Sequence, residues 1–225
     1  MAVTEKQIVI VGCGPGGPDY VTPAAHEAVA RTDVVLGPKR LLALFPDCAE
    51  RQNLLPPAVE PAIEVVTEHL PHGTVAVLVS GDPGMFSLAT PLVAHFGQAT
   101  CHVIPGISSL TVAFARLGIS LSDARIVSAH GRIPDLSADE LSRSEKIAIF
   151  GGTKDATAWV ARVAQTLSPT HTLFVCENLT LADESVRELT AESLLAAELP
   201  SLTLMILVER HLLGQTDDRP DPRRG

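Results

Sequence analysis

Ser80-Gly81-Asp82-Pro83-Gly84-Met85-Phe86 is the stretch around which the rest of the chain can be organised. It follows Thr74-Val75-Ala76-Val77-Leu78-Val79, a short apolar run that is typical of a fully buried strand in a parallel sheet. The turn therefore leaves the carboxyl end of a strand, where open α/β sheets bind ligands. Its glycines allow close approach of the backbone to a ligand, and Asp82 would bring a carboxylate to that edge. An aspartate in such a turn can equally do no more than hydrogen-bond its own backbone.

Two further turns of this kind follow predicted strands. The strand at 7–11 ends in the Gly/Pro turn 12–18, and the strand at 100–104 ends in Pro105-Gly106-Ile107-Ser108-Ser109. The third turn precedes a predicted helix, whose first N–H groups would suit a polar ligand, although an ordinary serine N-cap is the better explanation from the local sequence. One such turn is routine. Three in one series of strands and helices predict a shared cleft at the carboxyl edge of one parallel sheet.

The first turn also satisfies Gly-x-Gly-x-x-Gly, the fingerprint of dinucleotide-binding domains, through Gly12, Gly14 and Gly17. We interpret this match as accidental. Pro15 removes a backbone N–H from the middle of the phosphate cradle, and the next helix begins only at Thr22-Pro23, which fit the N-cap and N1 positions. The turn therefore serves another ligand or is merely tight, and a dinucleotide-binding oxidoreductase is kept as an alternative.

Composition limits the class of protein. The 225 residues fit one large or two small domains, and 46% hydrophobic residues are enough for a core. A net charge of −9 argues against nucleic acid as a partner, because phosphate binding needs a basic face. The four cysteines are scattered, and neither a signal peptide nor an apolar run of about 20 residues is present. We therefore expect a soluble, cytoplasmic protein with no membrane partner.

The remaining elements follow less regular patterns. Residues 41–57 are predicted to be loop or short helix. In the second half, strands are predicted at 124–129, 146–150, 171–176, 185–189 and 202–208, with helices at 138–141 and 156–167. Because strands and helices alternate loosely there, we expect a mixed sheet. The pattern restarts after Gly118, which predicts α/β domains at 1–118 and 119–213 and a disordered tail at 214–225.

Side chains that could perform chemistry are few. The chain lacks a P-loop, the metalloprotease motif His-Glu-x-x-His and the nucleophile elbow Gly-x-Ser-x-Gly, and its eight histidines show no metal-ligand spacing. No metal site is predicted. His130, at a strand end beside Gly131 and Arg132, is the one functional candidate among the histidines, a plain turn residue being the alternative. This scarcity indicates a catalyst that binds and orients its reactants.

Three motifs, taken in order, resemble the tetrapyrrole (corrin/porphyrin) methylase family: Val-Ile-Val-Gly-Cys-Gly-Pro-Gly at 9–16, Ser-Gly-Asp-Pro-Gly at 80–84 and Pro-Gly-Ile-Ser-Ser at 105–109. With Ala-Phe-Ala-Arg-Leu-Gly at 113–118 and His-Gly-Arg at 130–132, they are similar to one branch, the precorrin-6Y and cobalt-precorrin-7 C5-methyltransferases of cobalamin synthesis. The likeness runs from residue 8 to about 208. Each motif alone is weak, but the ordered set with these spacings is specific.

This resemblance implies a fold and an activity. The fold would be two α/β domains with the active-site cleft between them, the first domain supplying a substrate trough and part of an S-adenosyl-L-methionine (SAM) site and the second domain the rest. The activity would be SAM-dependent methylation of the C5 meso carbon of a precorrin or cobalt-precorrin. A homodimer and a partner enzyme for C15 methylation with decarboxylation are also implied. Alternatives are a sister enzyme acting at another ring carbon and a non-catalytic tetrapyrrole-binding protein.

The resemblance also assigns site residues. Those expected to bind the cofactor are Pro15, Ser80, Gly81, Asp82, Met85, Ser108, Ser109, Phe150 and Leu179. In the catalytic set, His130 would act as a base that accepts a proton, and Arg132 would pair with the acetate and propionate groups of the substrate. Lys39, Arg40, Arg116 and Lys154 are weaker candidates for that pairing, since a solvated surface charge explains each of them as well.

Overall fold

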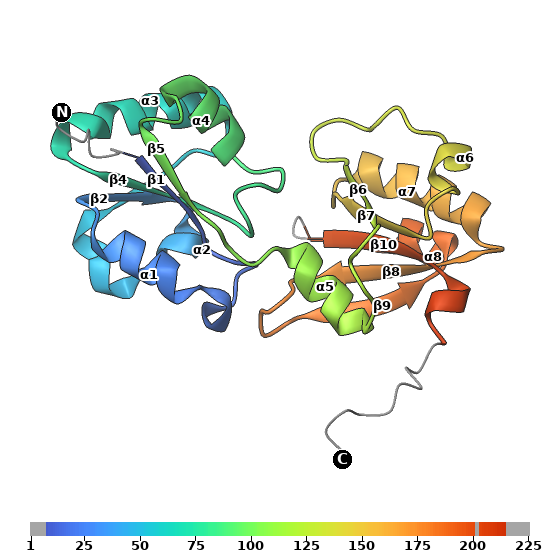
Figure 1. Cartoon of the computed structure of the whole chain (residues 1–225). Coiled ribbons are helices and arrows are strands. Elements are labelled where there is room, and N and C mark those ends of the chain that lie inside the picture. The colour runs from blue at the N-terminus through green and yellow to red at the C-terminus, as the bar shows by residue number, and fades with distance from the viewer. Residues whose placement is uncertain (1–7, 201–202, 215–225) are drawn as a thin grey trace, which may run out of the picture. The chain divides into compact units, whose positions relative to one another are not determined.

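The computed structural model describes residues 8–200 and 203–214. These residues form two compact units (Figure 1). The first, unit 1, runs to Val112 and also takes in Leu179–Ala182. The second, unit 2, comprises Ala113–Asn178 and the chain from Asp183 onward. Each unit is built on its own sheet.

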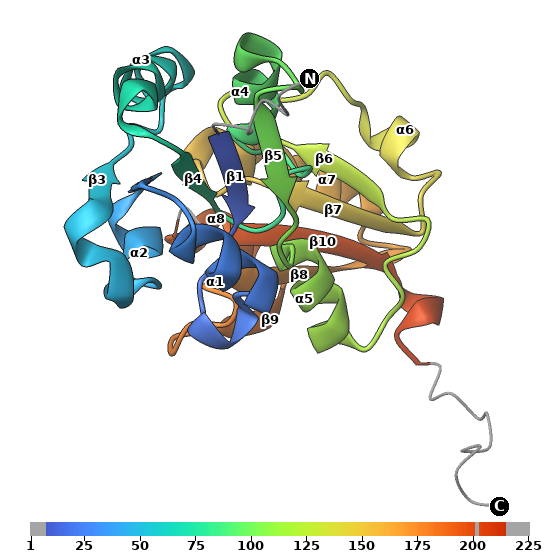
Figure 2. The ribbon, with the colours of Figure 1, turned by 60° about the vertical axis from the view of Figure 1, so that its left-hand side comes forward.

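Among the described residues, the sheet of unit 1 has five parallel strands in the order β3-β2-β4-β1-β5, with β1 between β4 and β5 (Figure 2). Their bounds are Ile8–Gly12 (β1), Val34–Gly37 (β2), Gln52–Leu54 (β3), Val75–Val79 (β4) and Cys101–Ile104 (β5). The short apolar runs pair in register, with Ile10 opposite Val77 on one side and Val103 on the other. The parallel arrangement brings the carboxyl ends of β1, β4 and β5 to one edge of the sheet, as predicted.

Helices cover both faces of this sheet (Figure 1). They are α1 (Pro23–Ala30), α2 (Lys39–Leu42), α3 (Val59–His69) and α4 (Ala89–Phe96), while α5 (Ser109–Leu117) begins in unit 1 and continues past its end. Alternate strand residues point to opposite faces. Ile10 and Val77 pack in the cluster that includes α3 and α4, whereas Val11 and Leu78 pack in the cluster that includes α1 and α2.

The order of the strands creates a switch point between β1 and β4. The chain leaves β1 toward α1 on one face of the sheet, and it leaves β4 toward α4 on the other face. The two connections therefore diverge at neighbouring strand ends. In open α/β sheets this is where a crevice for ligands forms.

Unit 2 has a mixed sheet, as expected from the sequence. Its described strands, in the order β6-β7-β10-β8-β9, are Arg125–Ser128 (β6), Lys146–Phe150 (β7), His171–Glu177 (β8), Ser185–Leu189 (β9) and Thr203–Glu209 (β10). Strands β6 and β7 are parallel, and the other pairs are antiparallel. The helices are α6 (Ala138–Leu141), α7 (Lys154–Leu167) and α8 (Ala191–Ala196). Trp159 and its neighbours on α7 bury one face of this sheet.

Two elements were not predicted. Strand β3, which lies within the stretch expected to be loop or short helix, has only three residues and an exposed edge, so Gln52 and Asn53 give no apolar signal. Helix α8 was also missed, although Thr190 caps it by accepting from Ser193 N. The predicted tail at 214–225 lies outside the described residues apart from Gly214. Within the part that is described, no helix is both long and apolar enough to span a membrane.

Candidate functional site

The turns after β1, β4 and β5 meet in direct backbone contact. A Cβ built on Gly12 would lie 2.6 Å from Gly106 N and 2.7 Å from Pro83 Cδ, and one built on Gly106 would lie 2.3 Å from Gly81 O. Gly14 and Gly81 also form an antiparallel bridge, in which Gly81 N donates to Gly14 O at 2.7 Å. Because glycine has no Cβ, the backbones of three chain segments can approach closely at the switch point.

Asp82 ties two of these turns together through both oxygens of its carboxylate. Oδ1 accepts from Gly84 N at 2.8 Å, which is the local turn that the sequence allows for. Oδ2 accepts from Gly106 N at 3.2 Å, so the same side chain joins the β4 turn to the β5 turn. Hydrogen bonds to a charged acceptor are the stronger kind, and the half-buried carboxylate is therefore held in a fixed orientation.

The N–H groups of the first turn are largely used within the protein. Cys13 N donates to Val79 O at 2.9 Å, Gly14 N donates to Gly81 O at 3.3 Å, and Gly17 N donates to the Thr180 hydroxyl at 2.8 Å. Pro15 has no N–H to offer. A dinucleotide fingerprint requires these groups to point at a pyrophosphate. This arrangement supports the interpretation that the Gly-x-Gly-x-x-Gly match is accidental.

Side chains of different polarity surround the three turns. Ser80 is exposed and its hydroxyl accepts from the Arg40 guanidinium, while Met85 is half-buried in the same turn. Pro15 is buried in the first turn. In the same turn, burial raises the pKa of the Cys13 thiol to about 12, so this thiol stays protonated near neutral pH.

The third turn provides hydroxyls at the start of α5. The Ser108 hydroxyl accepts from Leu110 N at 3.2 Å, which is the local cap that was the alternative for this residue. Ser109 is the first residue of the helix, and both serines are half-buried. The structure therefore brings together, within unit 1, the predicted residues of all three turns: Pro15, Ser80, Gly81, Asp82, Met85, Ser108 and Ser109.

The hairpin tip, Leu179–Ala182, is the connection between β8 and β9, and it also belongs to unit 1. Leu179, the predicted site residue here, is 5% exposed. Its neighbour Thr180 reaches the first turn through Gly17, a contact that the sequence did not predict. The two residues are 163 positions apart, so no local sequence pattern predicts their contact.

The other predicted residues lie in unit 2. His130 and Arg132 are exposed in the loop after β6, and Phe150 ends the adjacent β7. The His130 and Phe150 rings are 6.4 Å apart at their centroids, so these two residues are brought together. Burial of part of the imidazole lowers the pKa of His130 below its ordinary value of 6.5. Arg116, a weaker candidate, already pairs with Glu184 at 2.5 Å.

Phe86 is a second residue that the sequence reasoning left without a role. It has a positive φ of 48° and is 54% exposed, although it is aromatic. Strained backbone of this kind concentrates at functional sites. The signal was present in the sequence, as an aromatic residue two positions after the Gly-Asp-Pro-Gly turn.

Comparison with known proteins gives consistent results. The family model Tetrapyrrole (Corrin/Porphyrin) Methylases matches residues 7–195. A cobalt-precorrin-7 C(5)-methyltransferase of Salmonella typhimurium is 33% identical over 204 residues, which cover 90% of this chain and 100% of that protein. A precorrin-6Y C(5,15)-methyltransferase [decarboxylating] of Sinorhizobium sp is 31% identical over 148 residues, covering 65% of this chain and 35% of that protein.

Among solved structures, a cobalamin biosynthesis precorrin-6Y methylase from Archaeoglobus fulgidus matches with a TM-score of 0.69 and 28% identity. The match covers 90% of this chain and 97% of that one. The fold, the three joined turns and the sequence similarity over nearly the full length agree with one another. The chain belongs to the family of tetrapyrrole (corrin/porphyrin) methylases.

Proposed function

We propose that this chain is a SAM-dependent methyltransferase of cobalamin biosynthesis that methylates the C5 meso carbon of a precorrin or cobalt-precorrin. The observation that carries the proposal is the 33% identity to a cobalt-precorrin-7 C(5)-methyltransferase over the whole length of that enzyme. The three turns joined at the switch point of unit 1 are the place where a ligand of this sheet would bind.

The groups around these turns fit a methyl donor that carries an amine, a carboxylate and a ribose. Ser80 is exposed and Ser108 and Ser109 are half-buried, and each hydroxyl has a proton to donate beside the fixed carboxylate of Asp82. Such groups can bond to a ribose or to the methionine end of the donor. In contrast, the first turn has little capacity left for a pyrophosphate, because its N–H groups are bonded within the protein.

When bound, SAM would supply a methyl group on a positively charged sulfur. The protein would have to hold the nucleophilic ring carbon next to that methyl group. The turn residues of unit 1 would fix the donor, Arg132 would fix the substrate through its carboxylates, and His130 would accept a proton. No other catalytic side chain is required, which agrees with the scarcity of such groups in the sequence.

The decisive experiment is methyl transfer by the purified chain. Cobalt-precorrin-7 and its metal-free counterpart would each be incubated with SAM whose methyl group carries carbon-13. We expect a mass increase of one labelled methyl group and an NMR signal that couples it to C5. A methyl group on another ring carbon would favour a sister activity, and binding of NADH without binding of SAM would favour an oxidoreductase.

The proposal is restricted to C5. The Sinorhizobium relative is named for C5 and C15, but the chain matches 35% of its length, whereas the Salmonella relative is matched in full and named for C5 alone. We assign the C15 step to a partner enzyme.

We also propose that the chain forms a homodimer and acts in the cytoplasm. The four cysteines are all free thiols, which accords with that compartment, and light scattering of the purified chain would test the dimer.

Arg132 is expected to act on the tetrapyrrole substrate and not on the methyl donor. Replacing it by alanine should raise the substrate KM about 10- to 100-fold, because one charge-assisted hydrogen bond to a substrate carboxylate is lost. The Kd for SAM should change less than about twofold. Arg162→Ala, which removes another exposed guanidinium of unit 2, is the matched control. Equal losses for both ligands in Arg132→Ala would contradict this role.

His130 gives a pH dependence with a defined sign. Its pKa lies below 6.5 because of burial, so the imidazole is neutral and able to accept a proton at pH 7. We expect kcat/KM to fall as pH drops through that lowered pKa and to become level as pH rises well above it. His130→Gln should lose about 100-fold in kcat and this acid limb together, and His95→Gln should keep both. An acid limb that persists in His130→Gln would exclude this residue as the base.

A further inference from the structure

The hairpin tip, Leu179–Ala182, packs against the glycine pair Gly16-Gly17. A Cβ on Gly17 would lie 2.5 Å from Thr180 O, and one on Gly16 would lie 3.0 Å from Leu181 Cδ2. At Gly17 the contact is with backbone, so a larger residue would require the chain to shift, whereas at Gly16 the Leu181 side chain would have to move aside. The two glycines are therefore explained by a chain segment that packs on them, not by a phosphate.

Thr180 forms a hydrogen bond between the hairpin tip and this glycine pair. Its hydroxyl accepts from Gly17 N at 2.8 Å, and both residues belong to unit 1. Gly17 N is one of the groups that would otherwise need water or a ligand as partner. The bond fixes the end of the turn whose middle is Pro15, two residues before Gly17.

The backbone of the tip is strained where this contact forms. Thr180 has a φ of 72° and Asn178 a φ of 48°, values that L-residues seldom adopt and that a β-branched residue adopts least of all. Such strain persists only where the surroundings fix the conformation, and it clusters at functional sites. A threonine kept in this conformation is therefore expected to have a role that its hydroxyl performs.

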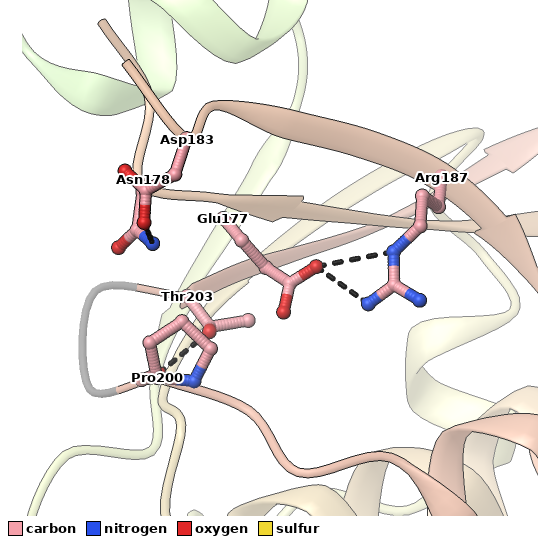
Figure 3. A network of polar contacts seen from close by, with 6 residues as sticks. All are labelled: Glu177, Asn178, Asp183, Arg187, Pro200 and Thr203. Carbon is pink, nitrogen blue, oxygen red and sulfur yellow. Dashed lines mark hydrogen bonds and ion pairs between the residues drawn. The ribbon is translucent and has the colours of Figure 1, made fainter. Parts of the chain in front are cut away.

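The base of the hairpin is fixed by polar contacts on both strands (Figure 3). Asn178 Nδ2 donates to Asp183 Oδ2 at 2.7 Å across the ends of the tip. One step further, Arg187 Nη2 on β9 bonds to Glu177 Oε2 on β8 at 2.6 Å, and this glutamate is 8% exposed. These contacts fix the two strand ends from which the tip projects.

We propose that Thr180 is a positioning residue of the methyl-donor site, acting through Gly17 on the turn that carries Pro15. This inference rests on the proposed function, because it takes the joined turns to be where SAM binds. Thr180 itself need not touch the donor. Its hydroxyl sets the shape of the first turn, and loss of the hydroxyl should weaken binding of the donor more than it weakens the fold.

The test compares variants that separate the hydroxyl from the strain. Thr180→Val removes the hydroxyl and keeps the branched shape, Thr180→Ser keeps the hydroxyl, and Thr180→Gly removes the hydroxyl and relieves the strain. The Kd for SAM is measured by calorimetry, the Tm by differential scanning and the exchange rate of the Gly17 amide by NMR. Thr190→Val is the matched control, because that hydroxyl caps α8 by accepting from Ser193 N at 3.1 Å.

We expect the Kd for SAM to rise about tenfold in the valine and glycine variants and to stay within about twofold in Thr180→Ser and Thr190→Val. Exchange of the Gly17 amide should speed up in the same two variants. If Thr180→Val fails to fold, Thr180→Gly gives the same comparison without strain. Unchanged binding in Thr180→Gly, or equal weakening in Thr180→Ser, would overturn the inference. Failure of the wild-type chain to bind SAM would instead overturn the proposed function.

Discussion

Replacing Gly106 by alanine is expected to cause a large loss of stability in unit 1. The new Cβ would lie 2.3 Å from Gly81 O and 2.7 Å from Gly12 O, and both are backbone atoms that cannot rotate away. The three turns would have to separate. Overpacking of this kind costs about 1–3 kcal/mol, and we expect the upper end because no flexible side chain can yield. The Kd for SAM should rise at least about tenfold, since the turns carry its proposed site.

The matched control is Gly118→Ala. Gly118 has a positive φ of 67°, but a Cβ there would meet no atom within 4 Å. This variant should lose only the cost of backbone strain, about 1 kcal/mol, and should bind SAM normally. Urea unfolding and calorimetry with SAM would measure both effects. Normal stability and normal binding in Gly106→Ala would show that the three turns are not packed as described.

Elements whose signal is local were predicted well. The helix at 138–141 was found with its bounds unchanged, because Ser137 and Glu140 form a capping box that four residues suffice to specify. Strands β7 and β9 also have their predicted bounds. Thr22, predicted as N-cap, accepts from Ala25 N at 3.1 Å, which places the helix start well after the glycine turn. This late start argues against a dinucleotide-binding domain, in which the helix opens on the glycine turn.

Features that depend on distant segments could not be predicted. The sequence suggested that three turns share one edge, but it could not show that Asp82 joins two of them, because Gly106 lies 24 residues away. The hydrogen bond that joins the hairpin tip to the first turn is between Gly17 and Thr180, which are 163 residues apart. A contact between segments so far apart is not reflected in the local sequence pattern of either one. The glycine pair could be recognised in the sequence, but the segment that packs against it could not.

The second large effect is expected at Asp82, where the structure distinguishes two roles. The sequence predicted Asp82 as a residue that binds the donor, but both oxygens accept from backbone N–H groups, at 2.8 Å from Gly84 and 3.2 Å from Gly106. Asp82→Asn offers only one acceptor oxygen and so must leave one of these N–H groups without its bond. Loss of a hydrogen bond to a charged group costs about 1.5–3 kcal/mol, which predicts about a 10- to 100-fold higher Kd for SAM.

The charge of the donor separates positioning by Asp82 from direct contact. SAM carries a sulfonium, whereas S-adenosylhomocysteine has a neutral sulfur. If the carboxylate mainly fixes the turns, Asp82→Asn should weaken binding of both ligands by the same factor, since the shape of the site is lost for both. If it faces the sulfonium, SAM should lose at least about tenfold more than S-adenosylhomocysteine. Asp33→Asn is the control, because Asp33 Oδ2 accepts from Thr74 N at 2.7 Å just before β4 begins, at the opposite end of that strand. It should lower stability and leave both affinities unchanged. Given the two backbone bonds, we expect equal weakening, and a selective loss of SAM binding would assign Asp82 to the sulfonium instead.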